Sequence, residues 1–218
     1  ARRGLYWMPD GGKLPYWEKG APFRPVLHEW LRRCGRLPVH GGAVGYADGG
    51  VFLAGAGGRG KSNVALSCLD SDLSYASDDF CVVQEAGGGW HVHSLYCTGK
   101  LAAGDLVRHP RLAGHASNPR SLASEKALFF LQQGFADKLI RTMPLKAIVM
   151  PQVAGTGASE IVSAAGAETQ RAIAMSTIQL SGWCGVSTFS QVARFVRALP
   201  CFRLRIGADF HNVPGLIG

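Results

Sequence analysis

The stretch from Val51 to Ser62 constrains this chain more than any other part of its sequence. It reads Val-Phe-Leu-Ala-Gly-Ala-Gly-Gly-Arg-Gly-Lys-Ser, an apolar run that ends in the pattern Gly-x-x-x-x-Gly-Lys-Ser. The helix-prone residues 63–69 follow directly. A strand, a glycine-rich turn and a helix N-terminus in this order form a phosphate-binding P-loop. A glycine-rich turn that binds nothing is the alternative, and the register of the flanking elements disfavours it.

This loop predicts a site for a nucleoside triphosphate and a metal ion. The residues expected to contact the nucleotide are Ala56, Gly57, Gly58, Arg59, Gly60, Lys61, Ser62 and Asn63. Lys61, expected to be an exposed loop lysine, would place its charge at the β- and γ-phosphates, and the Ser62 hydroxyl would ligate Mg²⁺. Arg59 either contacts a phosphate or points to solvent. ATP and Mg²⁺ are therefore the expected cofactors.

Length and composition predict one globular domain with a small appendage. The chain has 218 residues, 47% hydrophobic and 17% charged. We expect an N-terminal arm and helix over residues 1–36 and a P-loop domain over residues 37–218. The first residue is Ala1, so we expect the chain to begin inside a longer protein. No apolar run reaches the roughly 20 residues of a membrane span and no signal peptide opens the chain, so no membrane partner is expected.

Charge and cysteine usage narrow the expected partners and compartment. The net charge is +8, but the cations are dispersed and lack the aromatic motifs of RNA-binding sheets, so nucleic acid is not an expected partner. A polyanionic nucleotide or an acidic partner explains the charge equally well. The six cysteines show no Cys-x-x-Cys pair, and several lie in apolar runs where a thiol is usually buried. These features predict a reducing, cytoplasmic location.

Hydrophobic patterning predicts alternating strands and helices around the P-loop. A β-hairpin is expected to begin near His40 and to lead through residues 51–54 into the loop. Further strands are expected at residues 73–76, 80–84, 90–95, 127–131, 145–150, 160–163 and 202–206. Helices are expected at residues 25–34, 63–69, 165–175 and 190–199. Residues 97–125 show little periodicity and are interpreted as a functional loop or a broken helix.

Taken together, His40-Gly41, the P-loop and Asp78-Asp79 resemble the kinase domain of HPr kinase/phosphorylase, whose nucleotide-binding core is shared with phosphoenolpyruvate carboxykinase. His40 lies 21 residues before Lys61 and Asp78 lies 17 residues after it. The sequence just before Lys100 and just before the last strand resembles a divergent branch of this family. That branch includes kinases that phosphorylate a serine of lasso-peptide precursors. The resemblance implies an α/β fold with a P-loop-containing mixed sheet and flanking helices. Asn63 stands where HPr kinases usually carry an acidic residue, which argues against HPr as the acceptor.

The resemblance also implies roles for individual side chains. Asp78 would be the base that accepts the hydroxyl proton, assisted by His40, and Asp79 would face the metal with Ser62. The two aspartates are adjacent at an expected strand end, so their side chains diverge, and this division can be reversed. The alternative is that Asp78-Asp79 form an ordinary polar turn at the end of a strand. Lys100 and Arg108 are candidates for contact with the γ-phosphate or with an acidic substrate group.

Several other side chains have competing interpretations. The basic loop with Arg108, His109, Arg111 and His115 either recognises an anionic substrate or is simply solvated. His91 and His93 fit an exposed strand face better than a metal site, because no third ligand has suitable spacing. Trp183 and the aromatic residues of the segment 5–17 are interpreted as packing residues.

The function expected from these motifs is that of an ATP- and Mg²⁺-dependent kinase acting on a hydroxyl. The resembled branch points to a serine of a peptide or protein as the acceptor, including a natural-product precursor peptide, and a homo-oligomer is compatible with the sequence. A small-molecule kinase has the same core chemistry. A nucleotide-binding switch without turnover is an alternative of another class, and it would not need the Asp78–His40 pair. A nucleic-acid-dependent ATPase would need a clear Walker B strand and a sensor residue, and neither is clear in this sequence.

Overall fold

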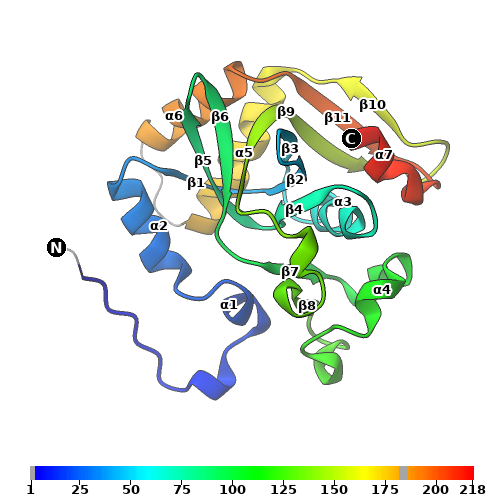
Figure 1. Cartoon of the computed structure of the whole chain (residues 1–218). Helices are drawn as coiled ribbons and strands as arrows, with labels where there is room; N and C mark the ends of the chain where they lie inside the picture. The colour runs from blue at the N-terminus through cyan, green and yellow to red at the C-terminus, as the bar shows by residue number, and fades with distance from the viewer. Residues whose placement is uncertain (1–2, 182–185) are drawn as a thin grey trace.

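The computed structural model describes residues 3–181 and 186–218, so the interpretation of Trp183 falls outside the described residues. A mixed, nine-stranded sheet forms the centre of the molecule (Figure 1). Its main path follows the order β1-β5-β6-β9-β3-β2-β4, and β11 branches from this path by pairing with β9 on one side and β10 on the other. The strands are β1 (Leu37–His40), β2 (Gly42–Tyr46), β3 (Gly49–Leu53), β4 (Ser74–Ser77), β5 (Phe80–Ala86), β6 (Gly89–Ser94), β9 (Thr142–Val153), β10 (Glu160–Ser163) and β11 (Cys201–Ile206). This confirms the expected α/β fold with a mixed sheet.

The strand that leads into the P-loop lies in the middle of this sheet. β3 pairs antiparallel with β2, which confirms the expected hairpin, and parallel with β9 on its other side. Phe52 and Leu53 are fully buried, as expected for a strand covered on both faces. The P-loop therefore begins at the end of a strand fixed by two neighbours.

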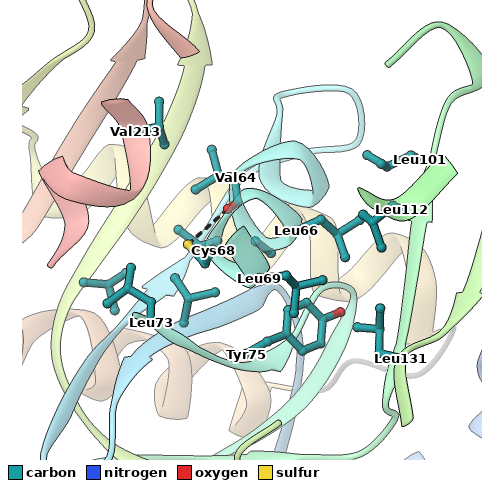
Figure 2. Close-up of a cluster of buried hydrophobic side chains, with 14 of the residues drawn as sticks. Val64, Leu66, Cys68, Leu69, Leu73, Tyr75, Leu101, Leu112, Leu131 and Val213 are labelled. Atoms are coloured by element: carbon teal, nitrogen blue, oxygen red, sulfur yellow. Dashed lines mark hydrogen bonds between the residues drawn. The ribbon is translucent and has the colours of Figure 1, made fainter. Parts of the chain in front are cut away.

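Helices cover both faces of the sheet (Figure 1). Figure 2 shows one face, where α3 (Lys61–Ser67) packs through Val64 and Leu66 into an apolar cluster with Tyr75 and Leu101. The short helix α7 (Val213–Ile217) adds Val213 to the same cluster. Burial of this apolar face holds the P-loop helix against the sheet, because a helix of this length is marginal alone.

The opposite face is covered by α5 (Gly166–Ser181) and α6 (Val186–Arg197). The Phe195 ring lies edge-on to the Phe52 ring, with 5.3 Å between centroids. It is tilted against the Trp90 ring, with 5.0 Å between centroids. Together with Ile173 and Val192 these rings form a second buried core. Both helices were expected, although α5 extends further than residues 165–175 and α6 begins before residue 190.

The segment 97–125 contains more structure than its sequence indicated. β7 (Thr98–Leu101) pairs antiparallel with β8 (Ala127–Phe130) in a separate two-stranded sheet. A 3₁₀ helix (Ala103–Arg108) and α4 (Pro110–Ala113) follow, so the interpretation as a broken helix is correct for this part only. The Thr-Gly-Lys-Leu sequence of β7 has no strand pattern of its own, and its conformation depends on pairing with β8.

The N-terminal region is also partly helical. α1 (Tyr16–Gly20) contacts β7 and β8, and α2 (Arg24–Arg33) contacts β1. Neither α1 nor α7 was expected, because each is too short to show a helical period. The boundary after residue 36 stays a prediction. Within residues 3–181 and 186–218, no helix has the length and apolar character needed to cross a bilayer.

Candidate active site

The predicted P-loop, residues 55–62, connects β3 to α3 through a backbone that depends on glycine. Gly55, Gly58 and Gly60 have φ values of 139°, 79° and 96°. Residues with a Cβ rarely adopt this region, so the loop shape requires glycine at these positions. Gly60 immediately precedes α3, which places the helix N-terminus and its free N–H groups at the loop.

Lys61 is buried, and the expectation of an exposed loop lysine is wrong. Only 6% of its surface is accessible. Its Nζ donates to the carbonyl oxygens of Gly55 at 2.7 Å and Ala56 at 3.1 Å, so the ammonium lies inside the curve of the loop. Burial lowers the pKa of Lys61, and the carboxylates of Asp78 and Asp79 oppose that shift. The loop thus encloses a cation where an anionic phosphate would bind.

His40 and Asp79 come together because β1 pairs antiparallel with β5. The register places His40 opposite Phe80, and the N–H of Gly41 donates to the Asp79 carbonyl at 2.9 Å. His40 Nε2 then lies 3.1 Å from Asp79 Oδ1. Burial lowers the pKa of His40, although the hydrogen bond to Asp79 opposes the shift, so the neutral ring donates its Nε2–H to the carboxylate.

Asp78 points away from this pair into the interior. It is 1% exposed, and its Oδ2 accepts a hydrogen bond from the Lys100 backbone N–H at 3.1 Å. Burial, together with the charge of Asp79, raises the pKa of Asp78 to about 6, and the Ser62 side chain partly offsets the shift. The expectation that the two aspartates diverge is confirmed, since their side chains meet different partners.

Asp79 is held ionised by two basic groups. Lys100 Nζ forms an ion pair with its Oδ2, while His40 contacts its Oδ1. Burial alone would raise the pKa of Asp79, but the His40 hydrogen bond and the Lys100 charge outweigh burial and lower it. The Asp79 side chain keeps 31% of its surface exposed, so solvent and ligands have access to this carboxylate.

The surroundings of Asp78 fit a divalent cation. Asp78 Oδ1 is buried and has no hydrogen-bond partner within the described part of the chain. An orphaned carboxylate oxygen of this kind is costly in a low-dielectric interior. Mg²⁺ prefers one or two carboxylates with hydroxyl, water and phosphate oxygens. Asp78 and Ser62, at the start of α3, provide a carboxylate and a hydroxyl of this type.

Two cavities each border the loop 55–62. The first has a volume of about 460 Å³ and contains the reactive groups His40, Ser62, Asp79 and Lys100, together with Gly57. It is completed by Tyr16, Trp17, Arg24, Phe80, Lys126 and Ser176. We call this space the acceptor-side cavity. The second, of about 450 Å³, lies where Gly55, Ala56 and Arg59 face β9 and α5, and we call it the nucleoside-side cavity.

Arg108 does not line the acceptor-side cavity. Its guanidinium lies 3.6 Å from Asp105 and over the ring of Phe210. The other basic side chains of this loop are also engaged with the body. Arg111 pairs with Asp70 at 2.9 Å, and the buried His109 contacts Asn63 Oδ1 at 3.1 Å. The basic side chains of this loop therefore do not converge on one anion-binding site, and they are not simply solvated either.

Asn63 has a structural role that its position in the motif did not reveal. Its side-chain amide donates to Asp105 at 3.0 Å, while its carbonyl oxygen faces His109. The side chain therefore ties α3 to the 3₁₀ helix 103–108. Only its backbone N–H, in the first turn of α3, is left for a nucleotide.

The two histidines of β6 have no further metal-ligating side chains grouped with them in the part of the chain that the structure describes. His91 and His93 are both half-buried on that strand. In the described part of the chain, no group of three or more His, Cys, Asp or Glu side chains is placed to hold a metal ion. The strand face that carries them is half-buried and not exposed as expected, and the absence of a metal site there stays a prediction.

The N-terminal wall of the acceptor-side cavity was not expected from the sequence. Trp17 is 47% exposed and borders the cavity, so its interpretation as a packing residue is wrong. Neither Arg24 nor Lys126 was assigned to a site. The segment around Trp17 has no motif or periodicity, so only its position beside β7 reveals this role.

Comparison with known proteins places the chain in a described family. A family model for the SynChlorMet cassette protein ScmC matches residues 23–211. A comparison with curated proteins gave no match. Among solved structures, the Hpr(Ser) kinase/phosphatase from Coxiella burnetii is similar, with 10% sequence identity and a TM-score of 0.42. That match covers 83% of this chain and 90% of the other.

Proposed function

This chain belongs to the SynChlorMet cassette protein ScmC family, and from the site that its residues build we propose that it is an ATP- and Mg²⁺-dependent kinase. The acceptor is a hydroxyl group, a serine of a peptide or protein. We place the protein in the cytoplasm, and a homo-oligomer stays a prediction.

One observation carries the proposal: two adjacent aspartates beside a P-loop have opposite environments. Asp78 is buried next to Ser62 with a free oxygen, whereas Asp79 opens into a cavity and is held by His40 and Lys100. Phosphoryl transfer needs a metal site and a separate proton acceptor beside the incoming hydroxyl. A protein that only binds nucleotide has no use for the second group.

The two cavities suggest how the nucleotide lies. The triphosphate would follow residues 55–62, where Lys61 and the N–H groups of the loop and of α3 bind phosphate oxygens. The nucleoside would then occupy the nucleoside-side cavity, which Arg59, Met150 and Met175 border. The γ-phosphate would point into the acceptor-side cavity, toward Ser62 and Lys100.

The aspartates take roles opposite to those that the resemblance implies. Mg²⁺ would be held by Ser62 and Asp78 and would neutralise charge on the phosphates. Asp79 accepts the proton of the acceptor hydroxyl, because it is the aspartate that borders the cavity and geometry takes precedence over pKa in choosing a base. His40 orients Asp79 through its Nε2–H. Asp78 has the higher pKa, but unlike Asp79 it does not border the acceptor-side cavity.

These side chains account for each bond and proton that changes in the transfer step. The acceptor oxygen forms a bond to the γ-phosphorus as the bond from that phosphorus to the β–γ bridging oxygen breaks, which releases ADP. The hydroxyl proton passes to Asp79 Oδ2 after Lys100 moves from that oxygen toward the transferring phosphoryl group. Lys61 and Lys100 stabilise the charge on the equatorial oxygens.

The test is transfer from γ-labelled ATP to serine-containing peptides with Mg²⁺. Wild-type protein should label the peptide, and Lys61→Met should not, because it keeps the aliphatic stem but removes the ammonium. Circular dichroism would establish that the variant is folded, which matters for a buried lysine. ATP binding without labelling of peptides or small hydroxyl compounds would identify a nucleotide-binding switch instead. Labelling of small compounds alone would identify a small-molecule kinase.

A further inference from the structure

One wall of the acceptor-side cavity is built by the N-terminal segment. Tyr16 and Trp17 of α1 and Arg24 at the start of α2 border the same space as Asp79 and Lys100. The rings of Tyr16 and Trp17 meet edge-on at 5.2 Å, and almost half of the indole surface is open. Ligand cavities are typically lined by aromatic side chains together with a few polar or charged groups, and this wall has both.

This wall is fixed to the body of the protein. The Thr98 hydroxyl donates to the Gly20 carbonyl at 2.7 Å, and the Tyr96 hydroxyl donates to the Pro22 carbonyl at 3.0 Å. Gly20 approaches so closely that a Cβ there would lie 2.8 Å from Leu128 Cδ1. Figure 1 shows α1 beside β7 and β8, and β7 also carries Lys100. The same strand, β7, therefore holds both this wall and Lys100 in place.

The charge of the wall is positive and only partly compensated. The Arg24 guanidinium lies over the Phe80 ring at 5.0 Å and 3.7 Å from Glu18, longer than a hydrogen bond. Lys126 forms no ion pair or side-chain hydrogen bond with any residue the structure describes. Its charge nevertheless acts on Lys61, so it lies toward the phosphate end of the cavity. Arg24, whose side chain stays 19% exposed beside Glu18, is the cation of residues 16–24 that borders the cavity.

We propose that residues 16–24 form the acceptor-recognition wall of this site and select a peptide with a carboxylate side chain near the phosphorylated serine. The inference rests on the proposed kinase function. The carboxylate binds the Arg24 guanidinium, whose planar donors suit bidentate contact. An apolar side chain of the same peptide packs on the open face of Trp17. A basic peptide is excluded because Arg24, Lys100 and Lys126 line its path.

Binding of serine-centred peptide pools tests this inference without requiring turnover. The full chain is immobilised with Mg²⁺ and a non-hydrolysable ATP analogue, and pools with acidic or basic flanking residues are applied. The acidic pool should be retained about tenfold more strongly. Arg24→Glu should remove or reverse this preference, and Trp17→Ala should weaken retention of the acidic pool. Binding of the ATP analogue should persist in both variants.

Matched controls separate local from general effects. Arg120→Glu makes the same charge change at an exposed site outside the cavity, and Trp30→Ala removes an indole that is 59% exposed elsewhere. Both should bind the pools as wild type does. Equal retention of the two pools, or a preference unchanged by Arg24→Glu, would overturn the inference. Failure of the wild-type chain to bind the ATP analogue would instead reject the proposed function.

Discussion

His40 Nε2 lies 3.1 Å from Asp79 Oδ1, across a sequence separation of 39 residues. The imidazole is buried and neutral, and its Nδ1 has no hydrogen-bond partner among residues 3–181 and 186–218. The ring therefore has one strong interaction, with the carboxylate that opens into the acceptor-side cavity. This contact fixes the direction of the Asp79 side chain through Oδ1 and leaves Oδ2, which pairs with Lys100 in this structure, as the oxygen that would accept the proton.

Exchanging each aspartate for asparagine should separate metal binding from proton transfer. Asp79→Asn keeps the shape of the side chain but removes its basicity, so labelling of the acceptor should fall by about 10²–10⁴-fold while Mg²⁺·ATP binding persists. Asp78→Asn should instead raise the Mg²⁺ concentration required. Measuring the labelling rate while Mg²⁺ is titrated at a fixed ATP concentration distinguishes the two variants. A higher Mg²⁺ requirement in Asp79→Asn alone would restore the division that the resemblance implied.

Replacing His40 should slow transfer less than replacing Asp79. His40→Ala removes one hydrogen bond to a charged group, worth about 1.5–3 kcal/mol, so the rate should fall by about 10- to 100-fold. His40→Gln can still donate to Asp79 and should recover part of the loss. Single-turnover rates at saturating ATP measure this effect. A rate for His40→Ala equal to that of wild type would remove His40 from the site.

The stability of the free protein should depend on pH through Asp78. Burial and the charge of Asp79 raise its pKa from 3.8 to about 6, so the folded protein binds this proton more tightly than the unfolded chain. The stabilisation is complete below the ordinary pKa and is lost as the pH rises through about 6. Asp79, whose pKa is lowered, acts in the opposite sense and loses its contribution only as the pH falls.

Thermal unfolding of wild type and Asp78→Asn, compared between about pH 4 and about pH 7, isolates this contribution. The advantage of wild type over the variant should shrink as the pH rises across that interval. Added Mg²⁺ and ATP should stabilise wild type more at the upper end, because the metal binds the ionised carboxylate. A difference between the two proteins that does not change with pH would contradict the burial argument.

Gly41 should be intolerant of any side chain. A Cβ at this position would lie 2.2 Å from Phe52 Cζ and 2.8 Å from the Leu53 carbonyl oxygen. Gly41→Ala should therefore cost about 1–3 kcal/mol of unfolding free energy, and it should displace His40, its neighbour in the chain. Denaturant unfolding measures the loss. Gly114→Ala, where a Cβ meets nothing within 4 Å, is the control and should change stability little.

The sequence predicted the parts of this protein that depend on local pattern. The glycine-rich loop between β3 and α3 was predicted because phosphate binding requires glycine, lysine and serine at fixed spacing, and because an apolar run precedes this pattern and helix-prone residues follow it. Asp78 and Asp79 were expected to point in different directions because neighbouring residues in extended chain do so. The buried state of Cys68 and Cys81 followed from their apolar neighbours.

Tertiary structure decided how these parts combine. The sequence left the roles of Asp78 and Asp79 reversible, and their unequal burial distinguishes them only because β1, β5 and β7 converge at this point. Trp17 and Arg24 belong to the site because α1 is bonded to β7 through Thr98. Such contacts join residues far apart in the chain. They depend on strand register and close packing, for which no local pattern in the sequence is sufficient.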